Sequence, residues 1–194
     1  MNREPSYQGR TLAQWLEDYN RAWSSGSDSK AQVLKVGSTN AIRHMGTNAI
    51  PFLLKKLSAK QNVFEERLKP VLEKIHFRDH DQERYLGLGG FMILGKDATS
   101  AVPALINLTS DPRSEVRYCA LRSIRCIAPD QGIILPVLLK TLHDSDRTIR
   151  SESVLIFSDC YPEEAKKAGV YVEFPVSLPR GTNQAPPSSS EGNQ

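Results

Sequence analysis

The sequence of 194 residues lacks any long uninterrupted apolar run, and it has few cysteines and little excess charge of either sign. No run approaches the roughly 18 apolar residues that a membrane-spanning helix needs. The formal net charge of +3 is too small to indicate a nucleic-acid partner by itself. The first ten residues, MNREPSYQGR, have no apolar core of the kind that directs secretion, so we expect a cytoplasmic protein.

Only three cysteines are present, and this odd, sparse set argues against a disulfide framework. Cys119 and Cys126 are seven residues apart, so on one helix they would lie roughly 10 Å apart along the axis. That separation is too long for a disulfide bond. We therefore expect Cys119, Cys126 and Cys160 to be small core residues rather than reactive thiols.

The sequence also lacks the residue patterns of common catalytic sites, such as G-x-S-x-G or a dense carboxylate cluster. His76 and His80 have a spacing that could hold a metal on one helix, but no third ligand is evident. The stretch from Gly90 to Asp97 resembles a phosphate-binding loop. However, Asp97 replaces the hydroxyl residue that would bind magnesium, and no apolar strand precedes the stretch. We predict no catalytic residue, no metal and no cofactor.

The sequence contains an internal repeat. When it is shifted by 33 residues and aligned with itself, prolines, arginines and apolar residues superpose. The pattern predicts that each 33-residue unit forms one helix that starts near the proline, then a turn, then a second helix that contains the arginine. Two helices per unit, with almost no alternating strand pattern, predict an all-α protein of the solenoid type. The matched sets are Pro70, Pro103 and Pro136; Leu72, Leu105 and Leu138; Arg84, Arg117 and Arg150; and Leu88, Leu121 and Val154.

The same register assigns a role to the acidic and glycine residues near the middle of the chain. Asp97 aligns with Asp130, which places both in turns between helices, where a carboxylate can cap free N–H groups. Gly87 aligns with small residues in both later copies. The repeat does not require Gly89 or Gly90, and each glycine inside a helix costs about 1 kcal/mol relative to alanine. We attribute these glycines to a close contact with the preceding helix.

Residues 94–124, LGKDATSAVPALINLTSDPRSEVRYCALRSI, resemble a HEAT repeat in their L-G, A-V-P-A-L and D-x5-R elements. The last copy departs from the pattern at Ser153, where alanine is usual. The stretches YQGRTLAQWLEDY and AIRHMGTNAIPFLLKKL are similar to the amino-terminal part of a group of bacterial HEAT-repeat proteins. The resemblance covers residues 7 to about 160. It implies a right-handed α–α superhelix of about four helix pairs, an armadillo-type fold.

Three parts of the chain are expected from these patterns. Residues 1–29 should form an amino-terminal capping helix and linker, residues 30–165 the HEAT-repeat solenoid, and residues 166–194 a disordered tail rich in proline and serine.

Local signals predict where the first helices lie. Apolar residues at helical spacing predict an amphipathic helix over residues 10–23, with Tyr19 and Trp23 on its apolar face. Gly46 should end the next helix, and Asn48 should cap a helix over residues 48–58 that carries Pro51 in its first turn.

HEAT arrays serve as protein-binding scaffolds in unrelated systems, so the resemblance implies a binding function without naming the partner. We expect a monomeric, non-catalytic scaffold that binds a protein or peptide on its concave face. Acid–arginine pairs should form a ladder between stacked repeats. The expected partner-binding residues are Arg122, Arg125 and Ser151, and the expected ladder residues are Asp111, Arg117, Asp144, Arg150 and Arg84.

Two alternative functions remain open at this point. Residues 41–80 contain eight basic and four acidic residues, a net charge of +4, and could bind nucleic acid. The resemblance also includes enzymes, namely HEAT-like alkylpurine DNA glycosylases and bilin lyases. HEAT-repeat hydroxylases of the deoxyhypusine type carry paired His-Glu motifs, and this chain has no His-Glu dipeptide.

Overall fold

The protein is all-α in a computed structural model that describes residues 3–25, 28–59, 80–127 and 130–172. The sequence-based prediction of an all-α class is thereby confirmed. The described strands are two short ones, β1 (Ser6–Tyr7) and β2 (Arg10–Thr11), which pair as an antiparallel hairpin before the first helix. Sequence patterning did not predict this hairpin. No helix within the described ranges is both long and apolar enough to cross a membrane.

The described residues form a succession of helices along the chain. In order they are α1 (Leu12–Ser24), α2 (Ser29–Met45), α3 (Ile50–Leu57), α5 (His80–Leu94), α6 (Val102–Leu108), α7 (Ser114–Ile127), α8 (Gln131–Thr141), α9 (Arg147–Cys160) and α10 (Pro162–Lys167). Two 3-10 segments, η1 (Gly46–Ala49) and η3 (Gly95–Ala101), precede α3 and α6.

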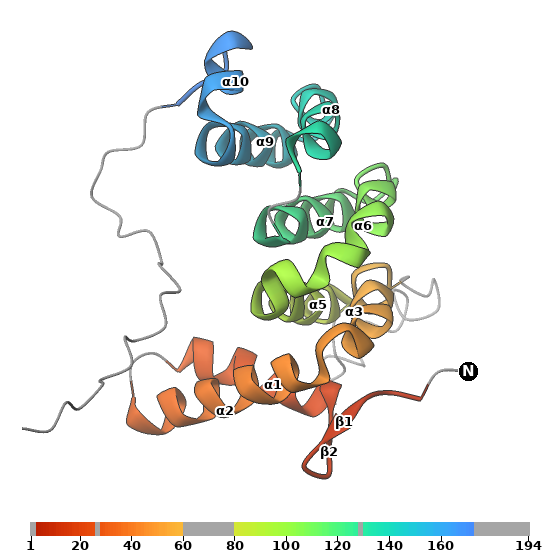
Figure 1. The fold of residues 1–194 in the computed structure, drawn as a ribbon, viewed down its shortest axis with the longest axis vertical. Helices are drawn as coiled ribbons and strands as arrows, with labels where there is room; N and C mark the ends of the chain where they lie inside the picture. Colours follow the sequence, from red (N-terminus) through yellow and green to blue (C-terminus); the bar gives the residue numbers. More distant parts are fainter. Residues whose placement is uncertain (1–2, 26–27, 60–79, 128–129, 173–194) are drawn as a thin grey trace, which may run out of the picture.

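Neighbouring helices pack as pairs, and the pairs stack on one another. The pairs are α1 with α2, α3 with α5, α6 with α7, and α8 with α9. Contacts between α5 and α7, and between α7 and α9, join successive pairs. Figure 1 shows α5, α7 and α9 one above another on one side of the stack, with α3, α6 and α8 on the other.

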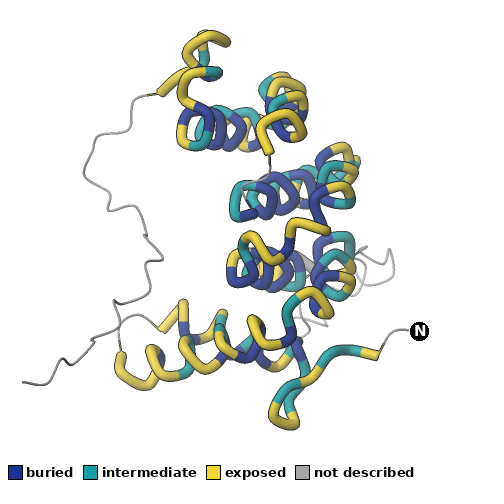
Figure 2. Tube along the Cα trace, in the orientation of Figure 1, coloured by how far each residue is buried: buried dark blue, intermediate teal, exposed yellow. Residues whose placement is uncertain are grey.

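One hydrophobic core runs through the whole stack, from α1 to α10. Phe91, Leu121 and Phe157 are among its largest fully buried side chains, one on each of α5, α7 and α9. Figure 2 shows the buried positions of these three helices continuing up the stack. Full burial of a side chain of this size contributes roughly 1.5–3 kcal/mol, so each of these three helices contributes substantially to the common core.

The helix boundaries repeat between the second and third pairs. Gly46 and Gly95 have φ angles of 54° and 52°, a left-handed conformation that suits glycine and ends α2 and α5. A 3-10 segment then leads into α3 or α6, each with a proline, Pro51 or Pro103, in its first turn. The structural counterpart of α6 is therefore α3. The helix expected to start near Pro70 falls outside the described residues.

Several predicted boundaries are wrong in detail. Asn48 lies in η1, and α3 begins after Ala49 with no side-chain cap. Asp97 lies in η3 and caps neither η3 nor α6, whereas Asp130 does cap α8 by accepting from the Gly132 N–H at 2.8 Å. The helix expected to start near Pro136 begins earlier, at Gln131, because Asp130 caps it there.

Helices from both ends of the described chain pack on the central helices. Helix α1, in the expected capping part, forms a pair with α2 and also contacts α5. At the other end α10 spans residue 165, buries Ala165 and packs on α9. Residues 173–194, most of the expected tail, lie outside the described residues.

Candidate functional site

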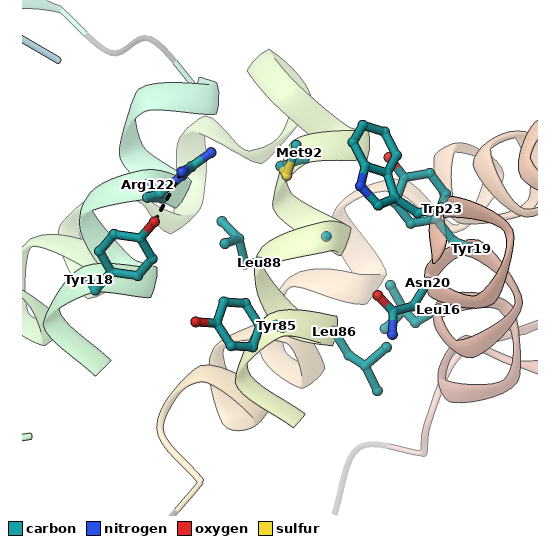
Figure 3. Close-up of a pocket in the computed structure, with 11 residues that line it drawn as sticks. Leu16, Tyr19, Asn20, Trp23, Tyr85, Leu86, Leu88, Met92, Tyr118 and Arg122 are labelled. Carbon is teal, nitrogen blue, oxygen red and sulfur yellow. Dashed lines mark hydrogen bonds between the residues drawn. The ribbon is translucent and has the colours of Figure 1, made fainter. Parts of the chain in front are cut away.

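A groove lies where α1, α5 and α7 meet. Its volume is about 310 Å³. We call it the aromatic groove, and Figure 3 shows its side chains converging from three helices. The lining comprises Leu16, Tyr19, Asn20 and Trp23 from α1; Tyr85, Leu86, Leu88, Gly89 and Met92 from α5; and Tyr118 and Arg122 from α7.

Large apolar side chains are exposed in this groove. Trp23 is 60% exposed, Tyr85 55% and Met92 42%. The Tyr19 ring lies beside the Trp23 ring, with 6.3 Å between centroids, and the Lys35 Nζ stands 4.3 Å from the centre of that indole. Single exposed apolar residues are common on proteins, but a cluster of aromatic rings around one hollow indicates a binding surface.

The sequence pattern placed Tyr19 and Trp23 on the core-facing side of their helix, and the structure corrects this for Trp23. The buried stripe of α1 is formed instead by Leu12, Trp15 and Leu16. Trp23 is the second-to-last residue of α1, and its ring projects into the groove.

The three glycines of α5 divide between two faces of that helix. Gly87 and Gly90 face α3: a Cβ on Gly87 would lie 3.0 Å from the Leu53 carbonyl oxygen, and one on Gly90 would overlap the Leu53 side chain. Gly89 faces the groove, where a Cβ would meet the Tyr19 ring at 3.8 Å. The expected close contact with the preceding helix therefore applies to Gly87 and Gly90.

Arg122 forms the polar edge of the groove on α7. Its Nη1 donates to the Tyr118 hydroxyl at 3.1 Å, and its Nε lies 3.7 Å from Glu152 on α9. Burial alone would lower the pKa of Arg122. The Tyr118 hydrogen bond and the Glu152 charge outweigh burial and raise the pKa, so the guanidinium stays charged. The groove therefore has a fixed positive charge at this end.

The other two predicted partner-binding residues do not line the groove. Arg125 reaches across to α9, where its Nη2 donates to Asp159 at 2.8 Å and its Nη1 lies 3.7 Å from Glu152. Glu152 is buried, and no donor in the described part of the chain is within hydrogen-bond distance of its Oε1. Ser151 is exposed on α9.

The predicted ladder residues meet in one place between the third and fourth pairs. Arg117 makes a two-pronged ion pair with Asp144, from Nη2 to Oδ1 at 2.7 Å and from Nε to Oδ2 at 2.9 Å. Burial would raise the pKa of the Asp144 carboxyl. The hydrogen bonds from Arg117 and from the Asp146 N–H outweigh burial and lower it. This pair links α7 to the start of α9.

Arg150 repeats part of this geometry one unit later. Its Nη1 donates to the carbonyls of Asp144 and Ser145 at 2.7 and 2.9 Å, as Arg117 Nη1 donates to those of Asp111 and Pro112. The arginine that the repeat places in each second helix thus closes the turn before its own helix.

The corresponding contact between the second and third pairs uses a residue that the repeat did not reveal. Both Asp111 oxygens accept from Arg113, and this bonding lowers the pKa of the Asp111 carboxyl. Arg113 Nη1 and Arg84 Nη2 both donate to the Ala59 carbonyl, at 2.6 and 3.2 Å. Arg113 aligns with Asp146 in the repeat, so sequence periodicity offered no signal for this role.

The basic region proposed for nucleic acid is only partly described. Arg43 Nε donates to the Ile93 carbonyl at 3.3 Å, and Lys56 is ion-paired with Glu83. Residues 60–79, which contain His76 and five of the eight basic residues, lie outside the described residues. In the described ranges no group of three His, Cys, Asp or Glu residues could hold a metal ion.

The thiols are part of the packing between helices. Cys119 is buried, and burial raises the pKa values of Cys126 and Cys160. A raised pKa disfavours the thiolate, which is the reactive form of cysteine.

Comparisons of the chain with protein-family models, curated proteins and solved structures give no match.

Proposed function

We propose that the chain is a HEAT-like right-handed superhelix that acts as a non-catalytic scaffold and binds a protein or peptide segment in the aromatic groove. The observation that carries this proposal is the cluster of Trp23, Tyr85 and Met92, all exposed around one hollow. The stacking of helix pairs, with equivalent helices on one side, supports the superhelical part of the proposal.

The energetics favour a bound polypeptide. Tryptophan, tyrosine and arginine are the residues that most often dominate binding energy at protein interfaces, and this groove contains all three types. At about 25 cal/mol per Å², covering some 100 Å² of exposed aromatic surface contributes about 2.5 kcal/mol. The rings of three helices together therefore offer enough apolar area for a specific contact.

The groove is also built on a rigid base. Its floor includes Leu86 and Leu88, both buried, on a helix that contacts α1, α3 and α7. A preformed surface binds more tightly because less conformational freedom is lost on association. The described residues of the lining offer hydroxyl, amide and guanidinium groups but no carboxylate, histidine or thiol. Such a set suits recognition better than acid–base or nucleophilic chemistry.

A random peptide library displayed on phage tests the proposal. The library should yield peptides that bind the wild-type chain and lose about tenfold or more in affinity for Trp23→Ser. Ile133→Ser is the matched control, because Ile133 is 51% exposed on α8, outside the groove. The proposal would be contradicted if the selected peptides bound wild type, Trp23→Ser and Ile133→Ser equally, or if the library yielded no binding peptide.

A further inference from the structure

The aromatic groove crosses helices instead of following one, and this geometry restricts what fits in it. Its lining comes from α7, α5 and α1 in turn (Figure 3). Tyr118 lies at one end, Tyr85 and Met92 in the middle, and Trp23 at the other end. A bound segment that contacts all of them runs across the three helices and meets a new one at each step.

The step between helices matches one polypeptide conformation better than the others. Packed helices lie about 8–10 Å apart. A polyproline II helix has three residues per turn and about 3.1 Å rise per residue, so the same edge recurs about every 9 Å. A β-strand repeats its face about every 6.7 Å, and an α-helix advances about 5.4 Å per turn. Only the polyproline II repeat places every third residue over a successive helix.

The polar groups of the lining suit the same conformation. A polyproline II backbone makes no internal hydrogen bonds, so its carbonyls need external donors. Trp23 offers an indole N–H and Asn20 an amide. The Tyr118 oxygen accepts from Arg122, which leaves the Tyr118 O–H free to donate. Flat aromatic rings also pack well against proline rings, as in other grooves that recognise proline-rich segments.

Charge fixes a further property of the occupant. In the part of the chain that the structure describes, Arg122 is the one charged residue of the lining, and Lys35 lies over Trp23 at the opposite end. Glu152 lies behind Arg122, buried and 3.7 Å away, without a hydrogen bond to it. A carboxylate that approaches Arg122 from the groove can therefore make the direct hydrogen bonds that Glu152 does not make.

Building on the proposed function, we propose that the aromatic groove binds a proline-rich segment of another protein in the polyproline II conformation. The segment crosses α7, α5 and α1 and carries an acidic residue next to Arg122. Residues 173–194 of the chain itself also contain prolines, but no two of these prolines are three residues apart, the spacing that would place one over each successive helix.

Synthetic peptides and the full-length chain test this inference by isothermal titration calorimetry, which keeps its readout when Trp23 in the groove is replaced. The probes are acetyl-EPPLPPLPP-amide and its mirror arrangement acetyl-PPLPPLPPE-amide, since a polyproline II helix can dock in either direction. At least one should bind. Replacing the prolines of that peptide with alanine should weaken binding about tenfold, because the free peptide then loses its preformed polyproline II conformation. Replacing its glutamate with lysine should weaken binding by a similar factor.

Protein variants separate the two parts of the proposal. Arg122→Gln should abolish the difference between the glutamate and lysine peptides while the proline dependence remains. Trp23→Ser should weaken every peptide, and Ile133→Ser none. Equal binding of the alanine and proline peptides, or a glutamate preference that survives in Arg122→Gln, would overturn the inference.

The outcomes also distinguish this inference from the proposed function. If library-selected peptides need Trp23 but neither proline probe binds, the proline-rich partner is refuted and the scaffold function stands. A peptide of residues 173–194 that binds the groove more tightly than both probes would assign the groove to the chain's own segment and overturn the choice of partner.

Discussion

Replacing Gly90 with alanine tests whether the glycines of α5 exist to let α3 approach. A Cβ at this position would overlap Leu53 Cδ2 and lie 2.9 Å from Cδ1 and 3.1 Å from Cγ. Leu53 is fully buried in the contact between α3 and α5, so moving its side chain aside disturbs a packed core. The matched control is Gly89→Ala, where the new Cβ meets only the Tyr19 ring at 3.8 Å.

The two substitutions should change the free energy of unfolding in opposite directions. Alanine is favoured over glycine inside a helix by about 1 kcal/mol, and this gain applies to both variants. Forcing a methyl group into a packed core costs typically about 1–3 kcal/mol, and this cost applies to Gly90→Ala alone. We expect Gly89→Ala to stabilise the fold by about 1 kcal/mol and Gly90→Ala to destabilise it by about 1 kcal/mol. A difference of about 2 kcal/mol corresponds to about 4–8 °C in Tm.

Urea unfolding followed by far-ultraviolet circular dichroism measures both variants, since the helical signal is large. A double-mutant cycle with Leu53→Ala isolates the contact. Without the leucine side chain, Gly90→Ala should become stabilising, because only the helix propensity remains. Gly90→Ala as stable as Gly89→Ala in the wild-type background would refute the reasoning.

Two further predictions concern the contacts between helices. Asp144→Asn should lower the free energy of unfolding by about 2 kcal/mol, because Arg117 loses its charged partner in a mostly buried contact. The Asp144 pKa is lowered in the folded state, so its contribution is present above about pH 4 and is lost as the pH falls through the native pKa. Unfolding of wild type and Asp144→Asn across this range should show a steeper loss for wild type, and equal slopes would contradict the assignment. Because burial raises the pKa values of Cys126 and Cys160, thiol reagents at neutral pH should label the native chain at least about tenfold more slowly than the urea-unfolded chain, and equal rates would show that the thiols are not protected.

The sequence predicts the helical class well because the second helices keep a strict period. Arg117 and Arg150 recur at 33 residues, and each closes the turn before its own helix through the same two carbonyls. The first helices are predicted less well. Pro103 lies in the first turn of α6, whereas Pro136 lies inside α8. A sequence alignment does not distinguish these two positions, so the two prolines predict the same helix start.

The candidate site was much less accessible to prediction. Of the three residues chosen for partner binding, only Arg122 lines the groove, because exposed positions of a second helix can face either the next helix or the hollow. Tyr85 and Tyr118 share one place in the 33-residue repeat, but Ser151 occupies that place in the last copy and Met92 aligns with Arg125. The repeat therefore gives a partial signal for two tyrosines of the groove and none for Met92 or Trp23. Only the three-dimensional packing of α1 beside α5 brings their side chains to one surface.

The ion pairs between α7 and α9 have a consequence for cooperativity between the ends of the molecule. The fourth pair supplies Glu152 and Asp159, the acidic groups that face Arg122 and Arg125, but it supplies no lining of the groove. In a stack of nearest neighbours, a terminal pair can open locally at a lower free energy than the whole fold. Opening of α8 and α9 would leave the aromatic surface assembled and free two guanidinium groups beside it. The stability of the carboxyl-terminal pair would then adjust how strongly the groove attracts negative charge.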